Sequence, residues 1–173
     1  MTESWRPGCP VPLEDLRLVR LSHWDFDGAV TTGELVVHRD VADDVVAVFA
    51  ELFDARFPVM RMELVDVYGA DDDLSTAANN TSAFNCRAVT GGARWSEHSY
   101  GTAIDINPVQ NPYVSNGSVL DPHAAPYLDR SLGAPGMILE GDVGVAAFAE
   151  IGWEWGGDWT EPIDYQHFSA TGR

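Results

Sequence analysis

The stretch SEHSYGTAIDINP, residues 96–108, places a histidine and an aspartate seven residues apart with a glycine between them. Asp105 is flanked by two isoleucines, so on a strand its carboxylate points away from their apolar side. An ionised carboxylate buried in this way requires a cation or a hydrogen-bond network beside it. Gly101 permits a tight backbone turn. The stretch therefore predicts that His98 folds back over the strand that carries Asp105.

A second group of polar residues lies further along the chain, in the sequence DYQHF. Asp164 and His167 are three residues apart, and in a turn that enters a strand both side chains can point to the same place. Zinc in hydrolases is typically held by three side chains drawn from His, Asp and Glu, which leaves a fourth position for water. His98, Asp105 and His167 provide such a set, and Asp164 can accept a proton from that water.

Hydrophobic periodicity predicts the main elements of secondary structure. Polar and apolar residues alternate in 16–26 and 33–39, and the Asp-Gly pair between these segments favours a hairpin. Apolar residues recur at helical spacing in 41–53, which predicts a helix that Asp40 caps. The other expected elements are a helix at 142–151, strands at 60–69, 82–89 and 163–170, and a loop at 70–81. This mixture predicts the α+β class.

The chain shows no repeats and no linker, so we expect a single domain over residues 1–173. Residues 1–15 contain several prolines and are predicted to form an extended arm. Residues 108–136 are rich in Pro, Asn, Gly and Ser without periodicity, which predicts a surface excursion beside the site. We expect the protein to be a monomer.

Composition limits the classes of partner. The formal net charge of −17 disfavours nucleic acid, because such binding depends on Lys and Arg side chains that neutralise phosphates. No apolar run is long enough to predict a membrane span. The first residues lack the basic and apolar regions of a signal peptide, so we expect none within this chain.

The two cysteines, Cys9 and Cys86, match no CxxC spacing of a metal site. In an exported protein they can form a disulfide that joins the N-terminal arm to the core. In a cytosolic protein they would be two reduced, buried thiols. We favour the disulfide.

Two motifs resemble those of a known family. SEHSYGTAID matches every fixed position of SxHxxGxAxD, the motif of the VanY-like D-alanyl-D-alanine carboxypeptidases and related L-alanyl-D-glutamate endopeptidases, which are bacterial cell-wall zinc peptidases. GWEWGGDW followed by DYQH is similar to the second motif, in which an acidic residue precedes a histidine by three positions. The resemblance covers about residues 60–170.

The resemblance implies a hedgehog/D-Ala-D-Ala peptidase-like fold, in which a small antiparallel sheet carries the zinc site and a few helices flank it. It implies the zinc ligands His98, Asp105 and His167, the catalytic base Asp164 and a substrate contact at Arg87. Ser96 is expected to cap the turn, and it can also contact the substrate. The implied substrate is the stem peptide of peptidoglycan, which places the protein outside the cell or at the cell wall.

These expectations leave more than one function open. A D-alanyl-D-alanine carboxypeptidase is favoured, but some family members have Glu where this chain has Asp164, and this difference favours the L-Ala-D-Glu endopeptidase branch. A non-catalytic cell-wall-binding protein with a structural metal would need no base at that position. A non-haem iron oxygenase also uses two histidines and one carboxylate, but there a histidine and the carboxylate usually lie two residues apart.

Overall fold

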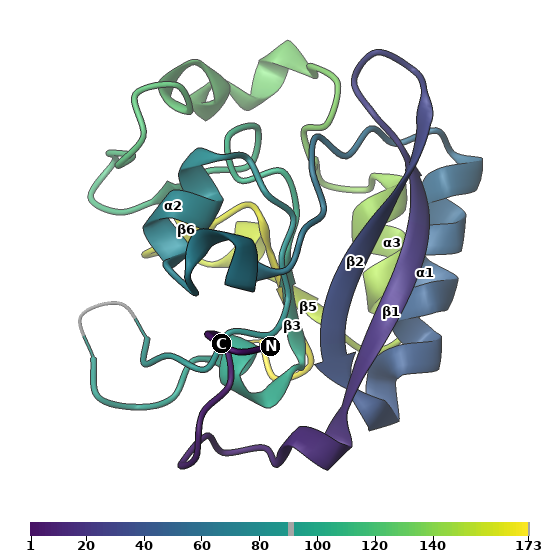
Figure 1. Ribbon diagram of the computed structural model, residues 1–173. Coiled ribbons are helices and arrows are strands. Elements are labelled where there is room, and N and C mark those ends of the chain that lie inside the picture. The colour runs from purple at the N-terminus through teal and green to yellow at the C-terminus, as the bar shows by residue number, and fades with distance from the viewer. Residues whose placement is uncertain (90–91, 173) are drawn as a thin grey trace.

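The computed structural model describes residues 1–89 and 92–172 (Figure 1). Its strands are β1 (Leu16–Trp24), β2 (Val30–His38), β3 (Ala103–Asp105), β4 (Tyr113–Val114), β5 (Glu154–Trp155), β6 (Ile163–Asp164) and β7 (His167–Ser169). Its α-helices are α1 (Ala42–Asp54), α2 (Asp72–Ala77) and α3 (Val143–Glu150). Its 3-10 helices are η1 (Leu13–Asp15), η2 (Arg39–Val41), η3 (Val65–Tyr68), η4 (Glu97–Tyr100), η5 (Ala125–Leu128), η6 (Arg130–Leu132) and η7 (Gly156–Asp158). Small antiparallel sheets with a few helices confirm the predicted α+β class.

The predicted hairpin is confirmed by β1 and β2, which pair antiparallel with Leu16 opposite His38. The Asp25 carboxylate closes the turn, because it accepts hydrogen bonds from the backbone N–H groups of Asp27 and Ala29 at 2.9 and 2.8 Å. Figure 1 shows the hairpin lying along α1. The hairpin thus covers one side of the main core.

The main core lies between the hairpin, α1, α3, β3 and β7. Its buried side chains include Leu35, Val37, Val45, Val48, Phe49, Leu52, Ile104, Phe148 and Phe168. The helix predicted at 41–53 is confirmed by α1, and that predicted at 142–151 by α3. Asp40, however, does not cap α1, because residues 39–41 form η2, and the Asp40 N–H donates to His38 Nδ1 at 3.3 Å.

A three-stranded antiparallel sheet, in the order β3-β7-β5, joins the two distant motifs. Ile104 lies opposite Phe168, and Asp105 opposite His167. Because side chains alternate along a strand, Ile104 and Phe168 pack into the core while Asp105 and His167 line a cavity on the other side. The strand predicted at 163–170 is thereby divided into β6 and β7.

The prediction of a strand at 60–69 is wrong. The side chain of Asn80 makes the backbone hydrogen bonds that a neighbouring strand would otherwise make. The Asn80 side-chain amide accepts a hydrogen bond from the Glu63 N–H at 2.8 Å and donates one to the Glu63 carbonyl at 2.9 Å. Beyond this point the chain turns into η3. At 82–89 the expected strand is reduced to isolated bridges, such as Ser82 with Asp105.

The prediction of a loop at 70–81 is also wrong, because residues 72–77 form the helix α2. The Asp71 carboxylate begins this helix by accepting a hydrogen bond from the Leu74 N–H at 3.0 Å, as N-cap residues do. The helix places its first residues at the rim of the cavity described below.

Arg130 helps to fix the excursion at 108–136, which also pairs with β6 through β4. The Arg130 guanidinium donates hydrogen bonds to the carbonyl oxygens of Gln110 and Ile138, at 2.7 and 2.6 Å, and to Asn111 Oδ1 at 3.0 Å. It also lies 4.3 Å from the ring centroid of Tyr165. The excursion therefore has defined contacts although its sequence has no periodicity.

None of the helices in the described ranges has the length and apolarity that crossing a bilayer requires.

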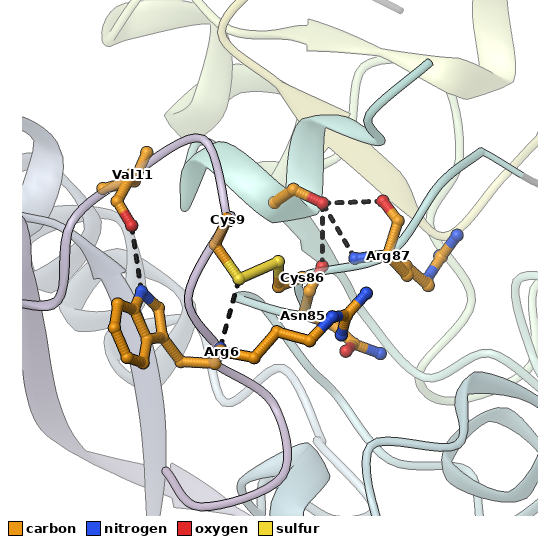
Figure 2. The surroundings of a disulfide bond; sticks show 8 residues. Arg6, Cys9, Val11, Asn85, Cys86 and Arg87 are labelled. Atoms are coloured by element: carbon orange, nitrogen blue, oxygen red, sulfur yellow. Dashed lines mark hydrogen bonds between the residues drawn. A yellow bond between two sulfur atoms is a disulfide. The ribbon is translucent and has the colours of Figure 1, made fainter. Parts of the chain in front are cut away.

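The N-terminal arm is joined to the core by a disulfide between Cys9 and Cys86, which confirms the favoured pairing (Figure 2). The Trp5 indole N–H donates to the Val11 carbonyl at 3.0 Å, and this bond holds the arm in a loop. The Cys86 N–H donates to the Ser4 carbonyl at 3.0 Å. The arm is thus bound to the segment that carries the next residue, Arg87.

Replacing both cysteines by serine should lower the free energy of unfolding by about 2–4 kcal/mol, because a cross-link over a long loop restricts the unfolded chain. The two cysteines are 77 residues apart in sequence. Urea unfolding followed by tryptophan fluorescence measures the change. Reduction of the wild-type protein should give the same shift and should leave the double serine variant unaffected. Equal midpoints for oxidised wild type and variant would contradict this expectation.

Candidate active site

Three side chains from separate elements meet at one end of the β3–β7 pair. His98 lies in η4, Asp105 ends β3 and His167 begins β7. The Asp105 carboxylate lies between the two imidazoles, with Oδ2 3.1 Å from His98 Nε2 and Oδ1 3.0 Å from His167 Nδ1. All three residues are buried, and one donor atom from each lies within 4.8 Å of the others. The structure thus brings the predicted set together as a group that can hold a metal ion.

A backbone carbonyl fixes the His98 ring from behind. His98 Nδ1 lies 2.6 Å from the Ala83 carbonyl oxygen, so Nδ1 carries a proton and Nε2 faces Asp105. Metal-binding histidines are usually oriented in this way, by donating their other N–H to a carbonyl or carboxylate oxygen. The two imidazoles and one carboxylate also suit a divalent transition metal. The residues present therefore fit the implied metal.

The electrostatics of the group favour a cation. Burial alone would lower the pKa of His98, but the Asp105 carboxylate raises it overall. Burial alone would raise the pKa of Asp105, but the two histidines hold it well below its usual range. The carboxylate therefore stays anionic, and positive charge is favoured beside it. A metal ion can supply that charge in place of a proton on the imidazole.

Gly101 makes the position of His98 attainable, as predicted. Its φ of +70° lies in the left-handed region, where it ends η4. A Cβ atom at this position would lie 2.6 Å from the backbone nitrogen of His38. That nitrogen donates a hydrogen bond to the Gly101 carbonyl at 2.8 Å, so the turn is packed directly against the end of β2. Both the backbone conformation and the close approach require glycine.

Replacing Gly101 by alanine should lower the free energy of unfolding by about 1–3 kcal/mol more than the matched variant Gly117→Ala. Gly117 has nearly the same φ, +71°, but a Cβ atom there would have no neighbour within 4 Å. The control therefore measures backbone strain alone, and the difference measures the clash with His38. Urea unfolding of both variants tests this, and equal losses would show that the turn can move away from β2.

The three side chains line a cavity of about 310 Å³, within the range of small-ligand pockets. The charged residues elsewhere in its lining are Asp72, Asp73, Arg87, Arg94, Glu97 and Asp164. Its apolar and aromatic lining consists of Val89, Tyr113, Leu120, Trp159 and Pro162. The ring centroids of Trp159 and His167 lie 5.4 Å apart, so aromatic surface borders the candidate metal site.

Asp164, the predicted proton acceptor, lies on β6 in the same cavity and pairs with Tyr113 on β4. Burial raises the pKa of Asp164 to about 7, and the Asp105 carboxylate adds to this shift. Its Oδ1 is buried without a hydrogen-bond partner among the described residues. A Cβ atom on Gly156 would lie 2.5 Å from the Asp164 carbonyl oxygen, so glycine permits this packing. A carboxyl group with a pKa near neutrality can both accept and donate a proton.

The remaining predicted residues, Arg87 and Ser96, also line the cavity. Arg87 Nη2 lies 2.9 Å from Asp72 Oδ2. The Ser99 hydroxyl accepts a hydrogen bond from the Arg87 N–H at 2.9 Å and donates one to the Arg87 carbonyl at 2.7 Å. Ser96 caps η4, as predicted, by accepting a hydrogen bond from the His98 N–H at 3.4 Å.

Sequence reasoning missed several residues of the cavity. Asp72 lies far from both motifs, and no spacing in the sequence connects it to the site. Tyr113 lies in the excursion at 108–136, which was expected beside the site, but it was not singled out. Gln166 lies between the predicted residues of the second motif, and its buried Oε1 has no hydrogen-bond partner in the part of the chain that the structure describes. Arg94 lies two residues before the first motif. The acidic N-cap pattern before α2 is the one signal that could have placed Asp72 on a helix.

Comparison with known proteins supports a peptidase. A family model described as D-alanyl-D-alanine carboxypeptidase matches residues 90–170, slightly less than half of the chain. The matched range contains the candidate metal ligands and Asp164, whereas Arg87 and Asp72 precede it. No curated protein and no solved structure matches the chain.

Proposed function

We propose that the protein is a zinc-dependent D-alanyl-D-alanine carboxypeptidase that acts on the stem peptide of peptidoglycan. The observation that carries this proposal is a buried group of two histidines and one carboxylate in a cavity that also contains Asp164. The similarity of residues 90–170 to the carboxypeptidase family supports the same reaction and substrate class. In this proposal, His98, Asp105 and His167 hold the zinc ion, which supplies a Lewis acid and lowers the pKa of water towards neutrality.

Asp164 acts as the general base and then as the general acid. It accepts a proton from the water whose oxygen attacks the scissile carbonyl carbon. It returns this proton to the leaving amine when the carbon–nitrogen bond breaks. Its raised pKa of about 7 suits both roles, since neither protonation state is strongly disfavoured at neutral pH.

Arg87 stabilises the negative charge that develops on the carbonyl oxygen. Its guanidinium is oriented by Asp72, and its backbone is fixed by Ser99. A donor that is oriented in advance stabilises a transition state without reorganisation during the reaction. Ser96 lines the same wall and is placed to contact the peptide backbone.

The proposal includes action outside the cytosol, at the cell wall. A disulfide between Cys9 and Cys86 supports this location, because disulfides persist in oxidising compartments. The location can be tested by detecting the protein in culture medium and wall fractions of its source cells.

Mass spectrometry of purified muropeptides digested with the zinc-loaded protein tests the reaction. A carboxypeptidase should convert pentapeptide stems to tetrapeptide stems with release of free D-alanine. Products cut between L-Ala and D-Glu would replace this reaction by the endopeptidase alternative. Unchanged muropeptides, with zinc bound to the protein, would refute a peptidase of this substrate class.

A further inference from the structure

We propose that Arg94 binds the free carboxylate of the peptide substrate, and that Asp72 prevents Arg87 from doing so. This inference rests on the proposed function and deepens it, because it assigns substrate recognition to a residue outside both motifs. It also restricts the substrate to peptides with a free carboxylate close to the scissile bond.

The two arginines that line the cavity differ in their partners. Arg87 is paired with Asp72 at 2.9 Å and is mostly buried, with 23% of its side chain exposed. The pair carries no net charge, and a substrate carboxylate would have to displace Asp72. Arg94 is exposed, and its guanidinium has no ion pair or hydrogen bond within residues 1–89 and 92–172. Its charge is therefore available to a ligand.

The backbone of Arg94 is held at the cavity although its side chain is exposed. Its carbonyl accepts a hydrogen bond from the Val89 N–H at 3.0 Å, and Ala88 and Trp95 form a bridge beside it. Trp95 packs against the hydrophobic cluster that contains Cys86. The base of the side chain is thus fixed, and a planar guanidinium can bind a carboxylate through two parallel hydrogen bonds.

The charge of the cavity explains why such a contact is needed. Five carboxylate side chains line it, from Asp72, Asp73, Glu97, Asp105 and Asp164. An anionic peptide is repelled by this wall, and the whole protein carries a formal net charge of −17. A bound metal ion offsets part of the charge at the reacting carbonyl. Arg94 supplies the unpaired positive charge away from that point, where a carboxylate can be held.

Binding measurements test this assignment without requiring turnover. The Asp164→Asn protein, loaded with zinc, is titrated calorimetrically with diacetyl-L-Lys-D-Ala-D-Ala and with the same peptide as its C-terminal amide. In that background, Arg94→Gln should weaken binding of the acid about 10- to 100-fold, the range of a charge-assisted hydrogen bond, and should leave the amide unchanged. Arg94→Lys should recover part of the loss, and Arg20→Gln, which removes an exposed guanidinium on β1, should have no effect.

A further pair of variants tests the role of Asp72. Asp72→Asn, added to Arg94→Gln, should restore part of the acid's affinity, because Arg87 is released. Asp73→Asn removes the same charge one residue away, and it should restore less. Equal restoration by the two, or equal effects of Arg94→Gln on acid and amide, would overturn the inference.

The outcomes are separable from those that test the proposed function. If Asp164→Asn binds neither peptide while the wild-type protein digests muropeptides, the carboxylate site is overturned and the peptidase proposal stands. If Asp164→Asn binds the acid through Arg94 while the wild-type protein digests no muropeptide, the carboxylate site stands and the peptidase proposal is refuted.

Discussion

Asp164→Asn should lower kcat at least about 100-fold and as much as 10,000-fold, while zinc remains bound. Asparagine has nearly the same shape but cannot take a proton from water, and general-base catalysis contributes rate factors of this size. None of the three side chains proposed as ligands is altered. Release of D-alanine and zinc content, measured on the same sample, together test the prediction.

The matched control is Asp158→Asn, which removes an exposed carboxylate on η7 outside the cavity lining and should keep wild-type turnover. The pH profile adds a second test. Because the pKa of Asp164 is raised to about 7 and a bound cation lowers it, the acid limb of kcat/KM should lie at or below about pH 7. Activity should rise with pH through this limb, as the carboxylate form is populated. Full activity of Asp164→Asn would remove Asp164 as the base.

His167→Ala should lose both bound zinc and turnover. Removing this imidazole leaves two of the three ligands. The loss of zinc affinity should therefore exceed the 10- to 100-fold loss that follows when only a residue hydrogen-bonded to a ligand is removed. Dialysis of the zinc-loaded variant against buffer, followed by elemental analysis, measures the metal. His123→Ala, at an exposed histidine outside the site, is the control and should keep both properties. Wild-type zinc retention in His167→Ala would exclude this histidine as a ligand.

The candidate site was more predictable from the sequence than were its surroundings. The alternation around Asp105 and the turn at Gly101 are local patterns, and each determines the direction of a side chain over a few residues. His167 is distant in sequence, but its motif resembled one from a known family, and its register opposite Asp105 confirmed that the two meet. Each part of the site could be predicted because a short segment of sequence determines where its side chains point.

The surrounding segments depended on contacts that no local pattern contains. The amide of Asn80 satisfies the backbone of Glu63, and so the segment at 60–69 needs no neighbouring strand. Arg87 is similar, because its pairing with Asp72 arises only when α2 packs beside it. Long-range side-chain contacts of this kind decide whether an apolar segment becomes a strand and whether an arginine keeps its charge free for a ligand.

We propose that His98, Asp105 and His167 together bind one divalent ion and leave a position open for water. X-ray absorption spectroscopy of the zinc-titrated protein tests it most directly. We predict one tightly bound zinc ion per chain, coordinated by two imidazole nitrogens and by oxygen atoms from a carboxylate and water. A coordination shell with fewer than two imidazoles, or a shell unchanged in His167→Ala, would contradict the account.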